Sequence, residues 1–208
     1  MYVPKHFAAD DAVVQELLLN HGAANLVTST PNGLLATFLP FVYDAESGAL
    51  LGHLARNNEQ WKTPVLGEAL VIVSGPDAYI SPSAYASKRE HGRVVPTWNY
   101  VTAHVYGNLV IHDDPAWLDS LVRRLTTKHE AGFEEQWSVD DAPAKFVEGQ
   151  LRAIVGIELV ISRIEAKAKL SQNRSRADVD GVIAALNSRG EVDSAEAVAT
   201  AVGDLDRS

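Results

Sequence analysis

Hydrophobic and polar residues alternate with the two-residue period of a β-strand over much of the chain. This alternation, together with short unbroken apolar runs, predicts seven strands. The first two are joined by Thr30-Pro31-Asn32-Gly33, where Asn-Gly is typical of a hairpin turn. Gly75-Pro76-Asp77 is expected to separate the fourth strand from the fifth. The predicted strands are 24–29, 34–43, 49–55, 68–75, 78–81, 97–112 and 155–168.

A helical period replaces the alternation in four other segments. Asp10 and Asp11 precede apolar residues at helical spacing that end at Asn20-His21-Gly22, and Asp114 and Pro115 are typical of the start of a second helix over 117–129. Further helices are predicted at 143–154 and 178–186. Residues 191–208 hold five acidic residues against one arginine and predict a poorly anchored tail or a weak helix.

The order of these elements predicts the fold class. Strands in hairpin order, with helices outside them, indicate an α+β protein built on a mainly antiparallel β-barrel of six to seven strands flanked by helices. Parallel βαβ winding does not fit, because helices do not alternate with the strands.

Composition narrows the possible functions. The chain has 208 residues, a net charge of −9 and no cysteine, which excludes disulfides and thiolate metal sites. No apolar run approaches the roughly 18 residues that span a bilayer, and no signal sequence is evident, so we expect a cytoplasmic protein with no membrane contact. Nucleic-acid binding would need a local basic patch. The candidates are Lys88–Arg93 and Arg123-Arg124 with Lys128, and a solvated surface explains each more simply.

The strongest chemical signal is the aromatic and polar cluster at the start of the longest predicted strand. Trp98 and Tyr100 fall on one face by the strand period, followed by Thr102 and His104. Two aromatic rings beside hydrogen-bonding groups can sandwich a flat heterocycle. The alternative is that they pack in the barrel core or in a dimer interface.

Two polar stretches that follow strands are candidate phosphate sites. The first, His53–Lys62, contains Arg56 and Lys62 at a strand end, and the second, Lys169–Ser175, holds two cations, two amides and two hydroxyls. Each is also explained as a solvated loop. No histidine pairs with a second metal ligand at helical spacing, and no known catalytic motif occurs, so no metal site and no catalytic residue are assigned.

Five motifs, in order along residues 1–176, resemble the PaiB family. They are Met1–Phe7, Gly52–Asn58 with Gln60–Lys62, Tyr79–Tyr85, Val95–Tyr100 with His104–Gly107, and Lys169–Arg174. The family is described as FMN-binding negative transcriptional regulators with the split β-barrel of pyridoxamine-5′-phosphate oxidases. The resemblance implies an FMN-binding split-barrel domain over 1–176 and a peripheral C-terminal helix with an acidic tail over 177–208.

The resemblance also implies a homodimer with two flavin sites at its interface. By motif position, Arg56 and Lys62 are similar to a phosphate-binding pair, Trp98 to Tyr100 would lie along the ring or ribityl chain, and Lys169 to Arg174 would close the site. The implied FMN ligands are His53, Arg56, Asn57, Lys62, Trp98, Asn99, Tyr100, Lys169, Ser171, Gln172, Asn173 and Arg174.

Three functions remain open from the sequence. The first is an FMN-binding transcriptional regulator that senses redox or metabolite state, although the acidic chain shows no recognisable helix-turn-helix for DNA. The second is a flavin-dependent oxidoreductase, and the third is a non-catalytic binding dimer. The sequence names no substrate, operator or effector.

Overall fold

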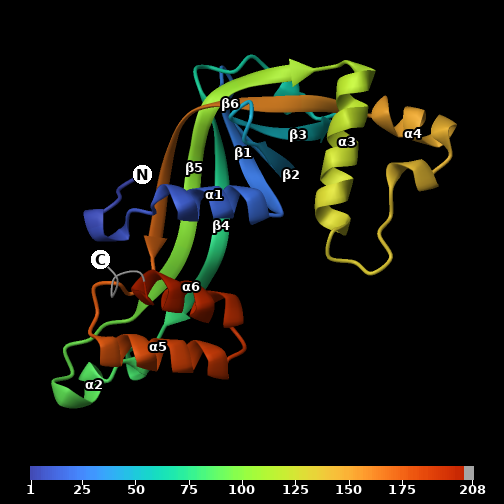
Figure 1. Ribbon diagram of the computed structural model, residues 1–208. Helices are drawn as coiled ribbons and strands as arrows, with labels where there is room; N and C mark the ends of the chain where they lie inside the picture. The colour runs from blue at the N-terminus through green and yellow to red at the C-terminus, as the bar shows by residue number, and fades with distance from the viewer. Residues whose placement is uncertain (204–208) are drawn as a thin grey trace. The chain divides into compact units, whose positions relative to one another are not determined.

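A computed structural model describes residues 1–203, and it contains six strands and six α-helices within that range (Figure 1). The strands are β1 (Ala23–Thr30), β2 (Gly33–Asp44), β3 (Ala49–Ala55), β4 (Ala69–Ile80), β5 (Thr97–His112) and β6 (Ile154–Lys169). The helices are α1 (Asp11–Asn20), α2 (Ser87–Glu90), α3 (Pro115–Glu130), α4 (Ala144–Leu151), α5 (Arg176–Ser188) and α6 (Val192–Gly203).

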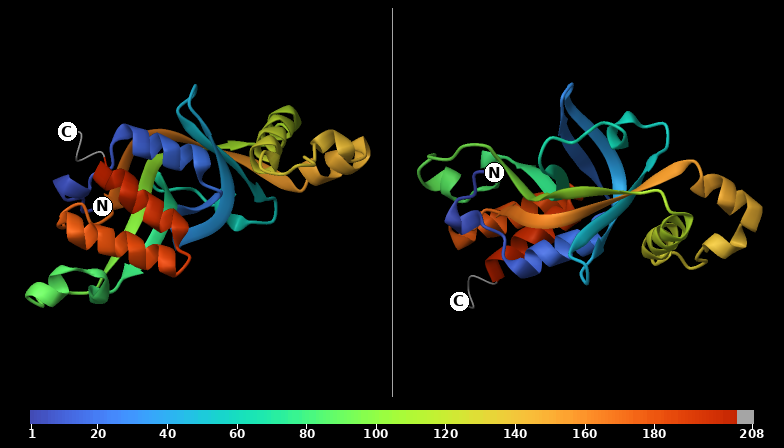
Figure 2. Two further views of the ribbon diagram at one scale, coloured as in Figure 1. Left: turned by 60° about the horizontal axis from the view of Figure 1, so that its bottom comes forward. Right: turned by 90° about the horizontal axis from the view of Figure 1, so that it is seen from above.

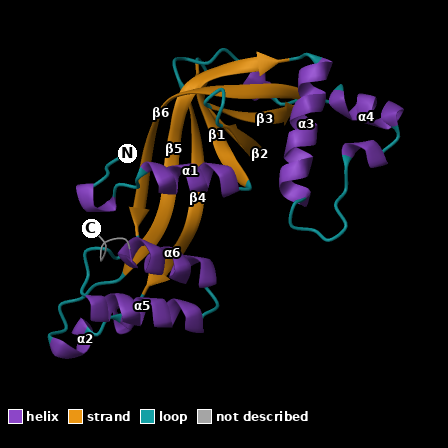
Figure 3. Cartoon of the chain, in the orientation of Figure 1, coloured by secondary structure: helices purple, strands orange, loops and turns teal. Residues whose placement is uncertain are grey.

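The strands close into an antiparallel barrel in the order β1-β2-β3-β6-β5-β4. The predicted α+β barrel is therefore confirmed, and the ribbon coloured by element type shows helices outside the strands (Figure 3). The predicted hairpin of β1 and β2 is confirmed, and its loop is two residues shorter than expected, because Thr30 and Gly33 pair as parts of the strands. The φ of Gly33 is 110°, which suits glycine. Alternate residues from every strand fill the barrel, including Leu26, Phe41, Leu50, Val71, Val105 and Ile157.

The prediction that Gly75-Pro76-Asp77 separates two strands is wrong, because β4 runs unbroken from Ala69 to Ile80. All three residues of this segment lie within the strand. Pro76 lies beyond Leu70–Ile72, the part of β4 that pairs with β1. The donor that proline lacks is therefore not needed for pairing with β1.

Contacts divide the chain into two compact units. Unit 1 comprises 1–14, 74–103 and 165–208, and unit 2 comprises 15–73 and 104–164. The strands β4, β5 and β6 have residues in both units.

Unit 2 contains helices α3 and α4, which Figure 2 shows side by side. As predicted, Asp114 caps α3, where its side chain accepts a hydrogen bond from the Trp117 amide at 2.8 Å. Leu121 and Leu125 of α3 are buried against Ala49 and Leu51 of β3. This packing holds α3 against the barrel.

Unit 1 contains helices α5 and α6, which lie side by side (Figures 1 and 2). Of the two alternatives predicted for the segment that begins at 191, a poorly anchored tail or a weak helix, the helix is confirmed as α6. This helix is anchored, because Ala195 and Val198 are buried. Ser194 also donates a hydrogen bond to the Asp77 carbonyl at 3.1 Å. The helical spacing of the apolar residues of α6 is hard to recognise in the sequence, because most of them are small. Residues 204–208, the end of the predicted tail, lie outside the described residues.

Within residues 1–203, no helix is both long enough and apolar enough to cross a membrane.

Candidate functional site

Strand β5 directs consecutive residues of the aromatic motif to opposite faces in unit 1. Trp98 is 48% exposed, whereas Asn99 is 2% exposed. Tyr100 is half-buried and Val101 is buried, as a strand period of two requires. The predicted sharing of one face by Trp98 and Tyr100 is therefore confirmed, and Asn99 faces a different environment.

We call the exposed side the Trp98 face and define it by Tyr79, Trp98, Tyr100 and Lys167. The Trp98 indole donates a hydrogen bond to Asp77 at 2.8 Å, and its ring centre lies 6.1 Å from that of Tyr79. The Lys167 ammonium lies 5.4 Å from the Tyr100 ring centre. Since Trp98 is half exposed, packing in the barrel core does not explain it.

The other side of β5 borders a small cavity of about 100 Å³ in unit 1, which we call the Tyr85 pocket. Three separated stretches of sequence supply most of its wall. Its lining residues are Phe7, Tyr85, Thr97, Asn99, Lys169, Ser171, Asn173 and Arg174. The structure therefore brings together five of the predicted ligands, and sequence reasoning missed Phe7, Tyr85 and Thr97.

Two cations approach each other in the Tyr85 pocket. The Lys169 ammonium donates hydrogen bonds to the Thr97 hydroxyl and, at 2.6 Å, to the Trp98 carbonyl. Burial lowers the pKa of Lys169, and the charges of Lys167 and Arg174 lower it further. None of the described residues that line the pocket is a carboxylate, so no anion from the lining balances the two charges.

Tyr85 is deeply buried in the pocket wall, with 2% of its surface exposed. The Arg174 guanidinium is close enough to act as a donor to the Tyr85 hydroxyl, but no residue in 1–203 accepts the hydroxyl proton with good geometry. The Arg174 guanidinium lies 4.7 Å from the ring centre. Burial raises the pKa of Tyr85, so the phenol is a neutral donor at physiological pH.

The loop after β6 is fixed by its own hydrogen bonds. Ser171 has a φ of 68°, uncommon for a residue with a side chain, and its hydroxyl exchanges hydrogen bonds with the Asn99 amide. Gln172 accepts from the Leu170 amide and donates to the Ala168 carbonyl, both at 2.7 Å. Gln172 is thus a brace of the loop, whereas Ser171 and its neighbours form the wall of the pocket.

The remaining predicted ligands lie in unit 2, where Arg56 is already bonded within the protein. Its guanidinium donates to both oxygens of Asp113, at 3.0 and 2.5 Å, and to the carbonyls of Arg152 and Ile154. Four of its five N–H groups are therefore occupied. A phosphate that binds Arg56 has to compete with the Asp113 carboxylate.

The other three candidates of unit 2 differ in exposure. Asn57 and Lys62 are exposed, and the Lys62 ammonium donates to Glu59 at 2.8 Å. His53 is half-buried within β3, and burial lowers its pKa. His53 is therefore neutral at physiological pH.

Comparison with known families and curated proteins identifies the relationship. Residues 1–163 match the family model described as "Putative FMN-binding domain". The chain is 34% identical to the protease synthase and sporulation protein PAI 2 of Bacillus subtilis, over 88% of this chain and 87% of that protein. The chain belongs to this FMN-binding domain family, the PaiB family that its motifs resemble. An uncharacterized protein of Emericella nidulans is 31% identical over 86% of both chains.

Solved structures confirm the split-barrel fold. A conserved hypothetical protein from Mycobacterium tuberculosis superposes with a TM-score of 0.60 at 10% identity, covering 85% of this chain and 95% of that one. The flavocytochrome Anf3 from Azotobacter vinelandii gives 0.59 at 16% identity, covering 80% and 72%. At such low identities the likeness concerns the fold alone.

Proposed function

We propose that this PaiB-family protein binds FMN as a homodimer and acts as a transcriptional regulator. Family membership supports the cofactor, and the name of the Bacillus subtilis relative refers to control of protease synthesis and sporulation. When bound, FMN supplies an isoalloxazine ring that accepts electrons or hydride.

The observation that carries the cofactor proposal is the Trp98 face. A large aromatic side chain that is half exposed presents a flat surface on which a flavin ring stacks. Trp98 is held in one orientation by its hydrogen bond to Asp77, so little conformational freedom is lost on binding. The cation Lys167 beside Tyr100 favours an electron-rich or anionic ligand on this face.

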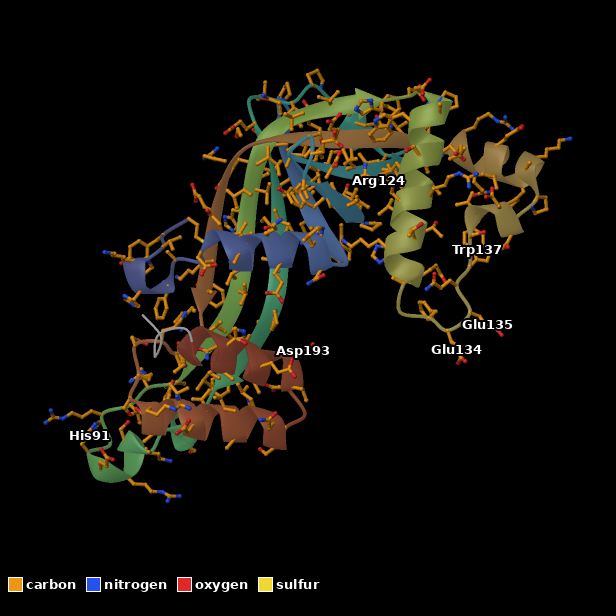
Figure 4. The ribbon with its side chains drawn as sticks, in the orientation of Figure 1. His91, Arg124, Glu134, Glu135, Trp137 and Asp193 are labelled. Carbon is orange, nitrogen blue, oxygen red and sulfur yellow. The ribbon has the colours of Figure 1, made fainter. Side chains whose placement is uncertain are left out.

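Titration of the full chain with FMN tests this role of Trp98. Stacking on an aromatic residue contributes about 1–3 kcal/mol, so Trp98→Leu is expected to weaken FMN binding by roughly 5- to 150-fold. Trp137, in the loop after α3, is also 48% exposed and provides a matched control (Figure 4). Equal FMN affinity in the Trp98→Leu and Trp137→Leu variants would contradict the proposal.

Arg56, Asn57 and Lys62 remain the proposed phosphate ligands. Because Asp113 holds the Arg56 guanidinium, replacing Asp113 with asparagine removes the competing charge. Asp113→Asn is then expected to tighten FMN binding several-fold and to leave the affinity for riboflavin, which lacks the phosphate, unchanged. Weaker FMN binding in this variant would show that the pair serves only to hold the loop.

The homodimer is supported by an apolar outer face of the barrel in unit 2. Leu34 and Phe38 of β2 are 74% and 68% exposed. Val27 of β1 lies in register with Ala36 of β2 and Leu70 of β4, so neighbouring strands continue the same face. Exposed apolar surface of this kind is typical of a protein interface.

Light scattering after size exclusion tests the dimer. The unaltered chain is expected at twice the monomer mass of 22.5 kDa. Phe38→Glu is expected to shift it to the monomer, because a charge at the centre of an apolar interface is desolvated without a partner. Phe133→Glu, at a residue 63% exposed in the loop after α3, is the control. A monomeric unaltered chain refutes the dimer.

The proposed DNA contact is confined to the segment Lys88–Arg93, which is exposed on α2 and the loop after it, where Figure 4 labels His91. The second basic candidate is largely neutralised. Arg123 pairs with aspartates, Arg124 lies 3.5 Å from Asp44, and Lys128 donates to two backbone carbonyls.

A mobility-shift titration across salt concentrations tests this contact. The double variant Arg89→Gln and Arg93→Gln is expected to lower the slope of log affinity against log salt by about 2, because each cation that meets a phosphate releases about one counterion. Absence of a shift at low salt, with the promoter region of the chain's own gene as probe, would count against direct repression.

A further inference from the structure

We propose that the Tyr85 pocket is a second binding site, separate from the Trp98 face, and that it takes the phosphate or carboxylate group of a compact anionic ligand. The inference does not depend on FMN binding. It rests on the charge, the buried donor, the size and the rigidity of the pocket.

The charge of the pocket favours an anion. Lys169 and Arg174 both line it, and none of the described lining residues carries negative charge. Asp178, which does not line the pocket, is close to Arg174 and accepts hydrogen bonds from the Ser87 amide and hydroxyl, both at 2.9 Å. Its single negative charge offsets part of the two positive charges, and the net charge of the three groups remains positive. Two like charges held together repel each other, and an anion between them converts that repulsion into attraction.

The Tyr85 hydroxyl supplies the second and independent observation. A buried hydroxyl without a hydrogen-bond partner is rare in folded proteins and calls for an explanation. Tyr85 lines the pocket, its hydroxyl is buried, and no residue in 1–203 accepts its proton with good geometry. An anionic oxygen in the pocket provides the missing acceptor and forms a charge-assisted hydrogen bond.

The size of the pocket limits the ligand. Its volume of about 100 Å³ is well below the roughly 300–1,000 Å³ of sites that enclose a drug-sized molecule. A three-ring isoalloxazine does not fit, whereas a phosphate or a carboxylate does. The pocket therefore recognises an anionic group and not a flavin ring.

The wall is preformed, as a binding site for a small ion requires. Asn99 and Ser171 hold each other by hydrogen bonds, and Gln172 braces the loop on both sides. Donors fixed by such contacts lose little freedom when a ligand binds. Asn99 and Trp98 point to opposite faces of β5, so the pocket and the Trp98 ring use different sides of that strand.

Calorimetric titration of the flavin-free full chain with inorganic phosphate tests the proposal. Saturable binding is expected, and Lys169→Met, Arg174→Gln and Tyr85→Phe should each weaken it. Loss of one charge-assisted hydrogen bond corresponds to about 10- to 100-fold in affinity for the two cation variants. Tyr85→Phe retains the ring and the fold and loses a single donor. Arg176→Gln is the charge-matched control, because Arg176 is 65% exposed, pairs with Asp180 and does not line the pocket.

A second arm distinguishes a free anion from the phosphate tail of a larger ligand. If phosphate binds and FMN neither competes with it nor loses affinity in Arg174→Gln, the ligand is a separate small anion, as proposed. A different result is that FMN displaces the bound phosphate, and that Arg174→Gln no longer binds FMN more tightly than riboflavin. The pocket then holds the flavin phosphate, and the separate site is overturned. If phosphate fails to bind, or binds equally to the unaltered chain and the Lys169→Met and Arg174→Gln variants, the anion site itself is overturned.

Discussion

Replacing Tyr85 with phenylalanine distinguishes the effect of the buried hydroxyl on the stability of the protein from its effect on ligand binding. The substitution keeps the ring that Arg174 lies against and removes only the buried hydroxyl. A buried polar group without a partner costs about 1–3 kcal/mol relative to the same group in water. Removing that hydroxyl should therefore make the ligand-free protein more stable. The expected gain is about 1 kcal/mol, at the lower end of this range, because Arg174 beside the hydroxyl already offsets part of the cost of burying it.

The magnitude is measurable by thermal or urea unfolding. For a chain of this size, 1 kcal/mol shifts the melting temperature by roughly 2–4 °C. Phosphate should stabilise the unaltered protein more than Tyr85→Phe, because a ligand raises stability in proportion to the logarithm of its concentration over its Kd. Tyr2→Phe is the control, since Tyr2 is 83% exposed and its hydroxyl is hydrated.

Two results would refute this reasoning. If Tyr85→Phe lowers the melting temperature in the absence of phosphate, the hydroxyl is hydrogen-bonded in the ligand-free protein and is not reserved for a ligand. If phosphate raises the melting temperature of both proteins equally, Tyr85 does not contact the anion.

Two further predictions concern stability. Gly181→Ala should destabilise the protein by about 1–3 kcal/mol in urea unfolding, because its Cβ would lie 2.1 Å from the Ala84 carbonyl oxygen; Gly149→Ala, where nothing lies within 4 Å, should be neutral or stabilising. Burial and the charge of Lys128 lower the pKa of His21 below its usual 6.5. The unfolded state therefore binds more protons than the folded state just below pH 6.5, so stability should fall as the pH drops from 6.5 toward 5. This loss should shrink in His21→Gln, and an unchanged pH profile in that variant would contradict the assignment.

The local signals in the sequence predict most of the fold. The barrel strands 49–55 and 97–112 have the predicted bounds. The hairpin at Asn32-Gly33 and the cap at Asp114 depend on chemistry within a few residues, and they are also confirmed. The prediction of a break at Gly75-Pro76-Asp77 was wrong for a physical reason. Whether a proline interrupts a strand depends on which strand it faces in the sheet, and the local sequence does not contain that information.

The candidate site was harder to predict because its walls come from distant segments. The many hydrogen-bond donors of Lys169–Arg174 indicate a binding segment in the sequence alone. Tyr85 and Thr97 give no such signal, because only the fold brings them to the same pocket. The aromatic motif was interpreted as one cluster around a heterocycle. In the structure Trp98 and Asn99 serve opposite faces, and the period of two that predicted the strand also implies this separation.

The overall charge of the chain bears on how such a pocket would select its ligand. A net charge of −9 opposes the approach of anions over distances of several ångströms, so electrostatic steering does not bring them to Lys169 and Arg174. Salt screens that repulsion beyond about 10 Å, whereas interactions with buried donors are screened much less. Binding then depends on short contacts with the two cations and the Tyr85 hydroxyl. Selectivity for a compact anion therefore arises from the shape and the donors of the Tyr85 pocket.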